Sequence, residues 1–169
     1  NNGSPVIYYG EEIGMRGSRG SANTDANRRL AMLWGDEDTI KDPVGSTYPV
    51  DKQITSTVSS QRADENSLYN YYCRLLAIRH KYPAIARGKY TALDFGEKNL
   101  GGFLIQYKDE TIVLVHNTSM TETITYDLSL CKTLDGISLS KLCDSIGVGE
   151  VTMEGSLLSA GPQSSALIK

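Results

Sequence analysis

The sequence is poor in residues that could hold a metal ion or a covalent cross-link. Its 169 residues include three cysteines and two histidines. The cysteines follow neither the spacing of a zinc site nor that of a dense disulfide framework, and the histidines lack the i, i+4 pairing of a metal-binding helix. We expect no metal and no cofactor, and interpret Cys73 and its two counterparts as small apolar residues, with a Cys131–Cys143 bridge as the alternative.

An excess of basic residues is also missing. Seventeen Lys and Arg stand against twenty Asp and Glu, for a net charge of −3, so no basic face is expected to neutralise a nucleic-acid backbone. The longest purely aliphatic run is Ile112–Val115, far short of the roughly 20 residues of a membrane helix. We therefore expect neither a nucleic-acid partner nor a membrane span.

The beginning of the chain has no initiator Met, no basic segment and no apolar signal segment. We expect the chain to be a piece of a longer protein. Apolar residues make up 40 % of the sequence and the mean hydropathy is −0.29. These values are typical of a folded domain with a modest core.

The first half predicts one strand, a long loop and one helix. Pro5–Tyr9 is apolar and β-rich and lies between turn residues, as in a buried strand. Residues 11–61 are polar and glycine-rich, without periodicity. Helical spacing of apolar residues predicts a helix over 64–82, with Asp64 as N-cap and Pro83 ending it.

After Pro83 the apolar residues recur with a period of two. This pattern, with polar turns between short runs, predicts an antiparallel sandwich over residues 90–169, against which the helix packs. The predicted strands are 90–95, 102–107, 111–117 and 122–128, followed by shorter pieces at 141–143, 149–153 and 165–168.

Several patterns in the long loop were candidates for chemistry. Gly14, Gly17 and Gly20 do not form the dinucleotide-binding fingerprint. Glu11 and Glu12 are neighbours in sequence, which does not suit two carboxylates that must flank one bond, and we interpret them as partners of nearby arginines. The arginines themselves are either solvated charges or include one that presents its planar donor fork to a polar ligand; they are Arg16, Arg19, Arg28 and Arg29.

Taken together, four segments resemble the α-amylase family of glycoside hydrolases. Gly3–Met15 is similar to the family's G-x-P-x-x-Y-Y-G-x-E-I-G-M pattern at the eighth barrel strand and the loop after it. Arg29–Trp34 resembles the R-T-P-M-Q-W segment, and Ser67–Ala84 resembles the final barrel helix. Ser164–Ile168 is similar to the last strand of the family's C-terminal sandwich. Three positions differ from the second pattern: Leu30, Ala31 and Leu33.

The resemblance implies a fold and a division of the chain. The fold is mainly β: an antiparallel Greek-key β-sandwich preceded by the last β/α unit of a truncated TIM barrel. Residues 1–83 would be the remnant of the (β/α)₈ catalytic barrel, and residues 84–169 the C-terminal β-sandwich domain.

The resemblance also implies a function. The parent would be a retaining hydrolase of α-glucans, acting on starch or maltooligosaccharides. The family's catalytic nucleophile, acid/base and transition-state-stabilising carboxylates belong to strands that would precede Asn1, so we expect this chain alone to be inactive. Arg29 and Tyr9 are the predicted substrate-binding residues, and Trp34 is either a stacking platform for a sugar or part of the core. An extracellular or cell-surface location is favoured for the parent, with the cytoplasm as the alternative.

A second reading treats the chain as a non-catalytic module. Its β-sandwich would then bind carbohydrate or only stabilise a barrel. In residues 84–169 the aromatic residues occupy strand positions that a core would use, which favours stabilisation. We also expect self-association through apolar groups at Val6, Ile7 and 30–34 that would lack their barrel partners.

Overall fold

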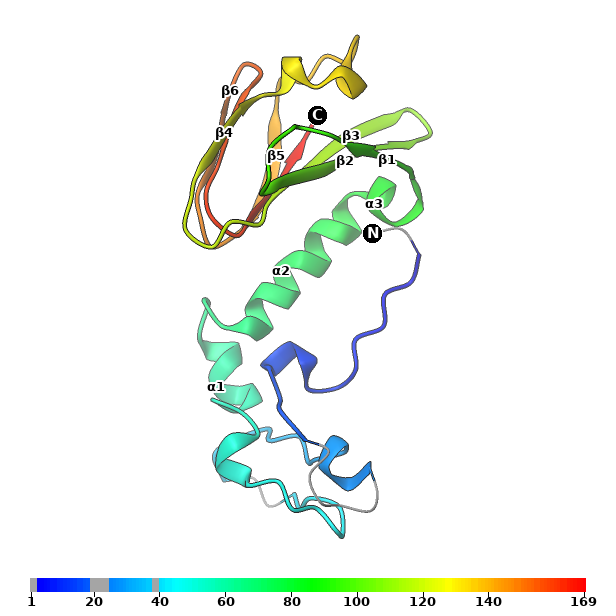
Figure 1. The fold of residues 1–169 in the computed structure, drawn as a ribbon. Helices are drawn as coiled ribbons and strands as arrows, with labels where there is room; N and C mark the ends of the chain where they lie inside the picture. The colour runs from blue at the N-terminus through cyan, green and yellow to red at the C-terminus, as the bar shows by residue number, and fades with distance from the viewer. Residues whose placement is uncertain (1–2, 19–24, 38–39) are drawn as a thin grey trace. The chain divides into compact units, whose positions relative to one another are not determined.

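The computed structural model describes residues 3–18, 25–37 and 40–169, which form two compact units (Figure 1). One unit is Pro5–Leu76; the other contains Ala77–Lys169 and the short segment before Pro5. The boundary between the units falls inside a helix. Arg19 and Gly20 lie outside the described residues.

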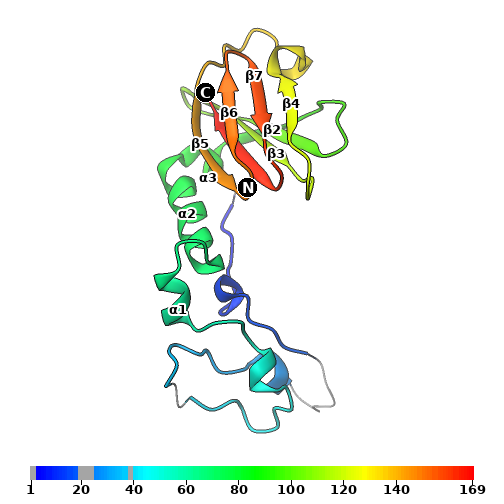
Figure 2. The ribbon, with the colours of Figure 1, turned by 90° about the vertical axis from the view of Figure 1, so that its left-hand side faces the viewer.

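The unit that contains Ala77–Lys169 is an antiparallel β-sandwich, as predicted. One sheet has the strand order β1-β2-β3-β8-β5 and the other β4-β7-β6, the latter seen side by side in Figure 2. All paired strands are antiparallel. The strands are β1 Lys89–Leu93, β2 Leu100–Tyr107, β3 Glu110–Asn117, β4 Ile124–Asp127, β5 Leu142–Gly147, β6 Val151–Glu154, β7 Leu157–Ala160 and β8 Ser164–Ile168. The sequence did not predict β7, because two consecutive leucines, Leu157 and Leu158, obscure the alternation of apolar and polar residues.

Both faces of the larger sheet are buried along its central strands. On β3, Val113 and Val115 belong to the core that includes Leu158 of the opposite sheet. The neighbouring Ile112 points to the outer face and packs with Ile85 of α3 (Pro83–Arg87). This helix therefore covers the outer face of the sandwich and gives β3 apolar partners on both sides.

The helix predicted over 64–82 is present as α2, Leu68–Lys81. Two short helices that were not predicted flank it, α1 Val58–Ala63 before it and α3 Pro83–Arg87 after it. Asp64 is not an N-cap but follows the end of α1. Ser67 replaces it as the residue whose side chain accepts a hydrogen bond from the first turn of α2, from the Asn70 N–H at 3.2 Å. Pro83 ends α2, as predicted, and begins α3.

Pro5–Tyr9 is not the buried strand that its composition predicts. These residues form no strand, and Val6 is 88 % exposed. A strand requires a neighbour with which to share backbone hydrogen bonds, and all described strands lie within residues 89–168. The loop that follows contains three 3-10 helices: η1 Glu11–Ile13, η2 Asp25–Arg28 and η3 Val50–Lys52.

Asn117 begins an Asn-Thr-Ser glycosylation pattern, but its side chain has a structural role. The residue is buried, and its Nδ2 donates to the carbonyls of Glu122, Ala160 and Gly161 at 2.8–2.9 Å. The amide links the end of β3 to the end of β7.

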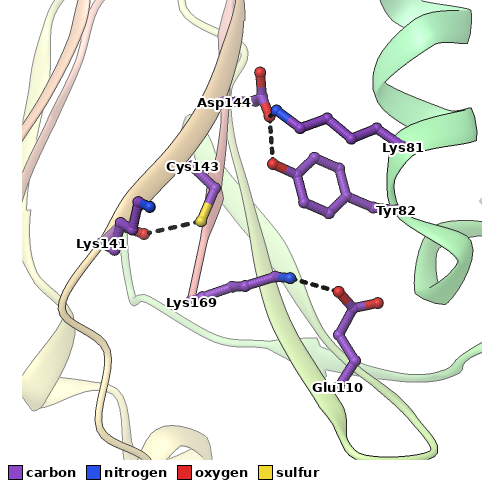
Figure 3. A network of polar contacts seen from close by, with 7 residues as sticks. All are labelled: Lys81, Tyr82, Glu110, Lys141, Cys143, Asp144 and Lys169. Atoms are coloured by element: carbon purple, nitrogen blue, oxygen red, sulfur yellow. Dashed lines mark hydrogen bonds and ion pairs between the residues drawn. The ribbon is translucent and has the colours of Figure 1, made fainter.

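A charged cluster joins the end of α2 to the larger sheet (Figure 3). Asp144 on β5 accepts hydrogen bonds from Lys81 Nζ, at 2.8 Å, and from the Tyr82 hydroxyl. Lys169 pairs with Glu110, and its ammonium lies 5.0 Å from the centre of the Tyr82 ring. Burial alone would raise the pKa of Asp144, but the bonds from Lys81 and Tyr82 hold that pKa below its ordinary value.

This arrangement predicts that acid weakens the sandwich unit. Because the folded state keeps Asp144 deprotonated more strongly than the unfolded chain does, the unfolded state takes up more protons as the pH falls, and stability decreases. The contribution of Asp144 to the free energy of unfolding is present above the ordinary carboxyl pKa of about 4. It is lost as the pH falls through the lower pKa that Asp144 has in the folded state. Urea unfolding of the chain should show Asp144→Asn destabilised relative to the unsubstituted chain at pH 6, with a smaller difference at pH 3.

Asp109→Asn is the matched control, since Asp109 is an exposed carboxylate next to the β2–β3 turn. It should change stability little at either pH. A destabilisation by Asp144→Asn that is the same at both pH values would contradict the assignment.

Candidate functional site

The two predicted substrate-binding residues lie in the Pro5–Leu76 unit, and the structure brings them to one place. The Tyr9 hydroxyl donates a hydrogen bond to the carbonyl of Leu30 at 3.0 Å. Leu30 is buried and directly follows Arg29. Residues from the start and the middle of the loop region therefore meet at this point.

Arg29 reaches into solvent. Its side chain is 66 % exposed, and its Nη2 lies 3.3 Å from Asp25 Oδ2. Asp25 also lies 3.7 Å from the Arg28 guanidinium. Because exposed ion pairs contribute little to stability, the Arg29 side chain contributes little to the stability of the fold. Its planar group of N–H donors is available to hydroxyl or carboxylate oxygens of a ligand.

The phenol of Tyr9 stays protonated over a wide pH range. Its pKa is raised, chiefly by burial and next by the neighbouring Tyr8, although Arg29 acts to lower it. The two tyrosine rings are in contact, with centroids 4.8 Å apart. Tyr9 therefore has a partly exposed ring and a neutral hydroxyl that is bonded to the Leu30 carbonyl, and no anionic oxygen at neutral pH.

On one side of Arg29 the backbone is held by a buried amide. Asn27 is 1 % exposed, and its Oδ1 accepts hydrogen bonds from the backbone N–H groups of Thr47 (2.8 Å) and Tyr48 (3.2 Å). Its Nδ2 donates to Thr47 Oγ1 at 3.0 Å. These bonds fasten η2, the short helix before Arg29, to the segment around Thr47.

On the other side of Arg29 the backbone is held by a carboxylate and a second buried amide. The Ala31 N–H donates to Asp42 Oδ1 at 2.8 Å. Asp42 Oδ2 accepts from Gln53 Nε2 at 2.7 Å, and Gln53 is 1 % exposed. The segment that carries Arg29 is thus fixed before and after it, while the guanidinium remains exposed.

A small pocket opens beside this segment. Tyr9, Met15, Arg16 and Leu30 are among its lining residues. Gly17, also in its wall, lies so close to Asn27 that a Cβ at this position would come within 2.3 Å of the Asn27 carbonyl oxygen. The lining combines apolar side chains, Met15 and Leu30, with the charged Arg16 and Arg28, and Asn27 also borders the pocket.

Among the residues that the structure describes, Glu11 and Glu12 have backbone partners and not the arginine partners that we expected. Glu11 Oε2 accepts from the Tyr8 N–H at 3.2 Å, and Glu12 Oε2 accepts from the Gly10 N–H at 2.9 Å. Gly10 has a φ of 90°, a left-handed conformation that favours glycine. The two carboxylates therefore stabilise the turn into η1.

The remaining candidate residues do not converge on a second site. No group of three or more His, Cys, Asp or Glu side chains within the described residues could hold a metal ion. All three cysteines are free, so the alternative of a Cys131–Cys143 bridge is not formed. His116 bonds Ser165 through Nδ1 at 2.8 Å, and burial lowers its pKa. Trp34 is 56 % exposed, so it does not belong to the core.

The residues that sequence reasoning missed are those that support the loop. Asn27, Asp42 and Gln53 stand in a stretch without periodicity, where polar residues are typical of solvent-facing loops. Their partners are 5 to 21 positions away. No local signal reveals such pairings, because they depend on how distant parts of the loop fold together.

Over the described residues, no helix has the length and apolar character needed to cross a membrane.

Comparison with known proteins relates both units to one family. A family profile described as "Alpha amylase, catalytic domain" matches residues 1–88. The alpha-amylase SusG of Bacteroides thetaiotaomicron is 34 % identical over 122 residues, which is 68 % of this chain and 17 % of that protein. Alpha-amylase 3 of Dictyoglomus thermophilum is 33 % identical over 125 residues, covering 71 % of this chain and 24 % of that protein. The chain thus spans a quarter or less of the length of these relatives.

Among solved structures, Amy13B of Eubacterium rectale matches 99 % of this chain with a TM-score of 0.83 and 26 % identity, covering 32 % of that chain. The α-amylase from H. orenii matches 99 % of this chain and 32 % of its own, with a TM-score of 0.71. At 22 % identity this second match bears on the fold alone.

The hydrogen bonds of Asp42 predict that its removal makes the segment around Arg29 more mobile. Asp42→Ala leaves the Ala31 N–H without its acceptor and the buried Gln53 amide with a weaker set of partners. A buried polar group left unpaired costs about 1 to 3 kcal/mol, so amide hydrogen exchange over 27–31 and 48–53 should accelerate. The control is Asp51→Ala, an exposed carboxylate in the same loop region. Equal exchange in both variants would show that Asp42 does not hold the segment.

Proposed function

This chain belongs to the α-amylase family, and we propose that it is the C-terminal part of an α-glucan hydrolase that acts on starch or maltooligosaccharides with retention of configuration. The observation that carries the proposal is the exposed Arg29 guanidinium, presented beside Tyr9 by a segment that is pinned on both sides. The names of the two relatives described above, both α-amylases, support the substrate class.

Retaining hydrolysis requires two carboxyl groups on either side of the scissile bond, about 5 to 5.5 Å apart. One attacks the anomeric carbon, and the other protonates the leaving oxygen and later activates water. Glu11 and Glu12 do not fit this task, since each is engaged with a backbone N–H. The resemblance assigns the catalytic carboxylates to barrel strands outside these 169 residues, so the chain supplies the rim of the sugar cleft.

We propose that Arg29 donates hydrogen bonds to sugar hydroxyls. A guanidinium stays protonated in proteins, so it can neither accept a proton nor attack carbon. Its function is to bind and orient. Tyr9 would contribute its partly exposed ring as a contact surface for the same sugar, since its hydroxyl is already bonded to Leu30.

For the domain organisation, we propose that residues 1–83 complete the (β/α)₈ barrel of the parent and that residues 84–169 form its C-terminal sandwich. The alternative, a sandwich that binds carbohydrate by itself, lacks support from its aromatic residues. A sugar platform is an exposed ring, whereas none of the five rings in this region is classed as exposed: Tyr90, Phe95, Phe103, Tyr107 and Tyr126. Because its rings are buried or half-buried, we propose that the sandwich stabilises the barrel and does not bind carbohydrate by itself.

The first test compares glycoside turnover. The 169-residue chain alone should hydrolyse no chromogenic maltooligosaccharide at a measurable rate, while the full-length enzyme should. Arg29→Ala in the full-length enzyme should lower kcat/KM by roughly ten- to a hundred-fold, since charged hydrogen bonds contribute about 1.5 to 3 kcal/mol each.

Arg62→Ala is the control for this variant, because it removes another exposed arginine of the same unit. It should leave kcat/KM within about twofold of the unsubstituted enzyme, as surface charges contribute little. Turnover by the isolated chain, or full activity of Arg29→Ala, would overturn the proposed roles.

We also predict that the isolated chain self-associates. Of the apolar groups expected to lack partners, Val6 and Trp34 are exposed, whereas Leu30 is buried. Leu75 and Leu76 are exposed as well, and such surfaces tend to associate. Light scattering at increasing concentration should show a rising mean mass, and Leu75→Ser with Leu76→Ser should reduce the rise. A concentration-independent monomer would contradict the prediction.

A further inference from the structure

We infer that Asn27 is a positioning residue for Arg29: its buried amide fixes the backbone from which the guanidinium reaches the sugar. The inference rests on the proposed function, because it takes Arg29 to be a substrate contact. It assigns a role to a residue whose side chain is almost wholly buried.

The Asn27 side chain is bonded within the protein. It is 1 % exposed, and both ends of its amide are bonded, Oδ1 to two backbone N–H groups and Nδ2 to the Thr47 hydroxyl. A third donor, Ser46 Oγ, lies 3.3 Å from Oδ1. These bonds join the backbone of η2 to the segment around Thr47, so they act on the position of the residues that follow Asn27.

Arg29 combines a fixed backbone with an exposed side chain. It follows Asn27 by two positions, and its N–H bonds the Ala26 carbonyl at 3.1 Å, so the turn of η2 continues to the backbone of Arg29. Its side chain pairs with the exposed carboxylate of Asp25 and extends into solvent. A rigid backbone below an exposed donor group is the arrangement that binding sites require.

The position of the Arg29 guanidinium depends on the direction of the backbone that carries it. A long side chain amplifies a change of direction at its Cα, and misplacing a substrate-binding group by about 1 Å can cost up to roughly a hundredfold in rate. After Arg29, Tyr9 bonds the Leu30 carbonyl and Asp42 bonds the Ala31 N–H. These bonds do not fix the backbone before Arg29, which the Asn27 amide fixes. Without the Asn27 amide, η2 is free to turn about that remaining attachment.

The test is a double-mutant cycle in the full-length enzyme, with kcat/KM for a chromogenic maltooligosaccharide as the readout. We expect Asn27→Ala to lower kcat/KM by roughly tenfold when Arg29 is present, and by less than about twofold in the Arg29→Ala background. Asn27→Asp keeps the acceptor for both N–H groups and should restore kcat/KM to within about threefold.

Thermal unfolding of the same variants separates positioning from general support. Asn27→Ala should lower the unfolding midpoint by the same amount with and without Arg29, since an exposed side chain contributes little to the fold. Its effect on kcat/KM should depend on Arg29. If Asn27→Ala does not fold, Thr47→Val provides the second variant, because it removes only the hydroxyl that accepts from Nδ2 and should show the same dependence on Arg29.

The outcomes are distinct. An equal loss of kcat/KM in both backgrounds overturns the positioning role, as does an unaffected kcat/KM for Asn27→Ala in the presence of Arg29. An Arg29→Ala variant with full activity instead overturns the proposed function on which the inference rests.

Discussion

Buried side-chain amides are the constraint on which the loop region depends. Asn27, Gln53 and Gln61 are each almost inaccessible to solvent, and each bonds backbone or side-chain groups from a different part of the loop. Gln61, for example, donates to the Ile13 carbonyl at 2.9 Å and accepts from the Tyr69 N–H at 3.3 Å. A region with few apolar groups to bury can still hold one conformation when its polar groups are paired in this way.

The sandwich unit is stabilised differently. Its two sheets enclose an apolar core, and α3 packs on the outer face of the larger sheet. Polar contacts there, such as the Asp144 cluster and the Asn117 amide, join ends of elements that the core has already placed. The sandwich unit is therefore stabilised mainly by burial of apolar surface, and the loop region mainly by hydrogen bonds of buried amides.

This difference bears on function. A site on a loop needs an exposed side chain over a fixed backbone, and apolar burial at the same place would cover the side chain that must meet the ligand. Paired amides and a carboxylate below the surface hold the Arg29 segment without covering its guanidinium. Because these supports are directional, they also fix the direction in which Arg29 leaves the backbone.

The sequence by itself determined the sandwich and the end of the helix at Pro83, because period-two runs and a proline act through local backbone geometry. It also indicated the family, through motifs such as Tyr8-Tyr9-Gly10. It did not determine that Pro5–Tyr9 would lack a strand. Nor did it determine that Ser67 rather than Asp64 would bond the first turn of α2, or that Asn27, Asp42 and Gln53 would hold the segment that carries Arg29. Those features depend on partners distant in the chain: a strand needs a neighbouring strand, competing caps are chosen by the fold around them, and a polar loop residue becomes a support only when tertiary structure buries it beside the groups that it can bond.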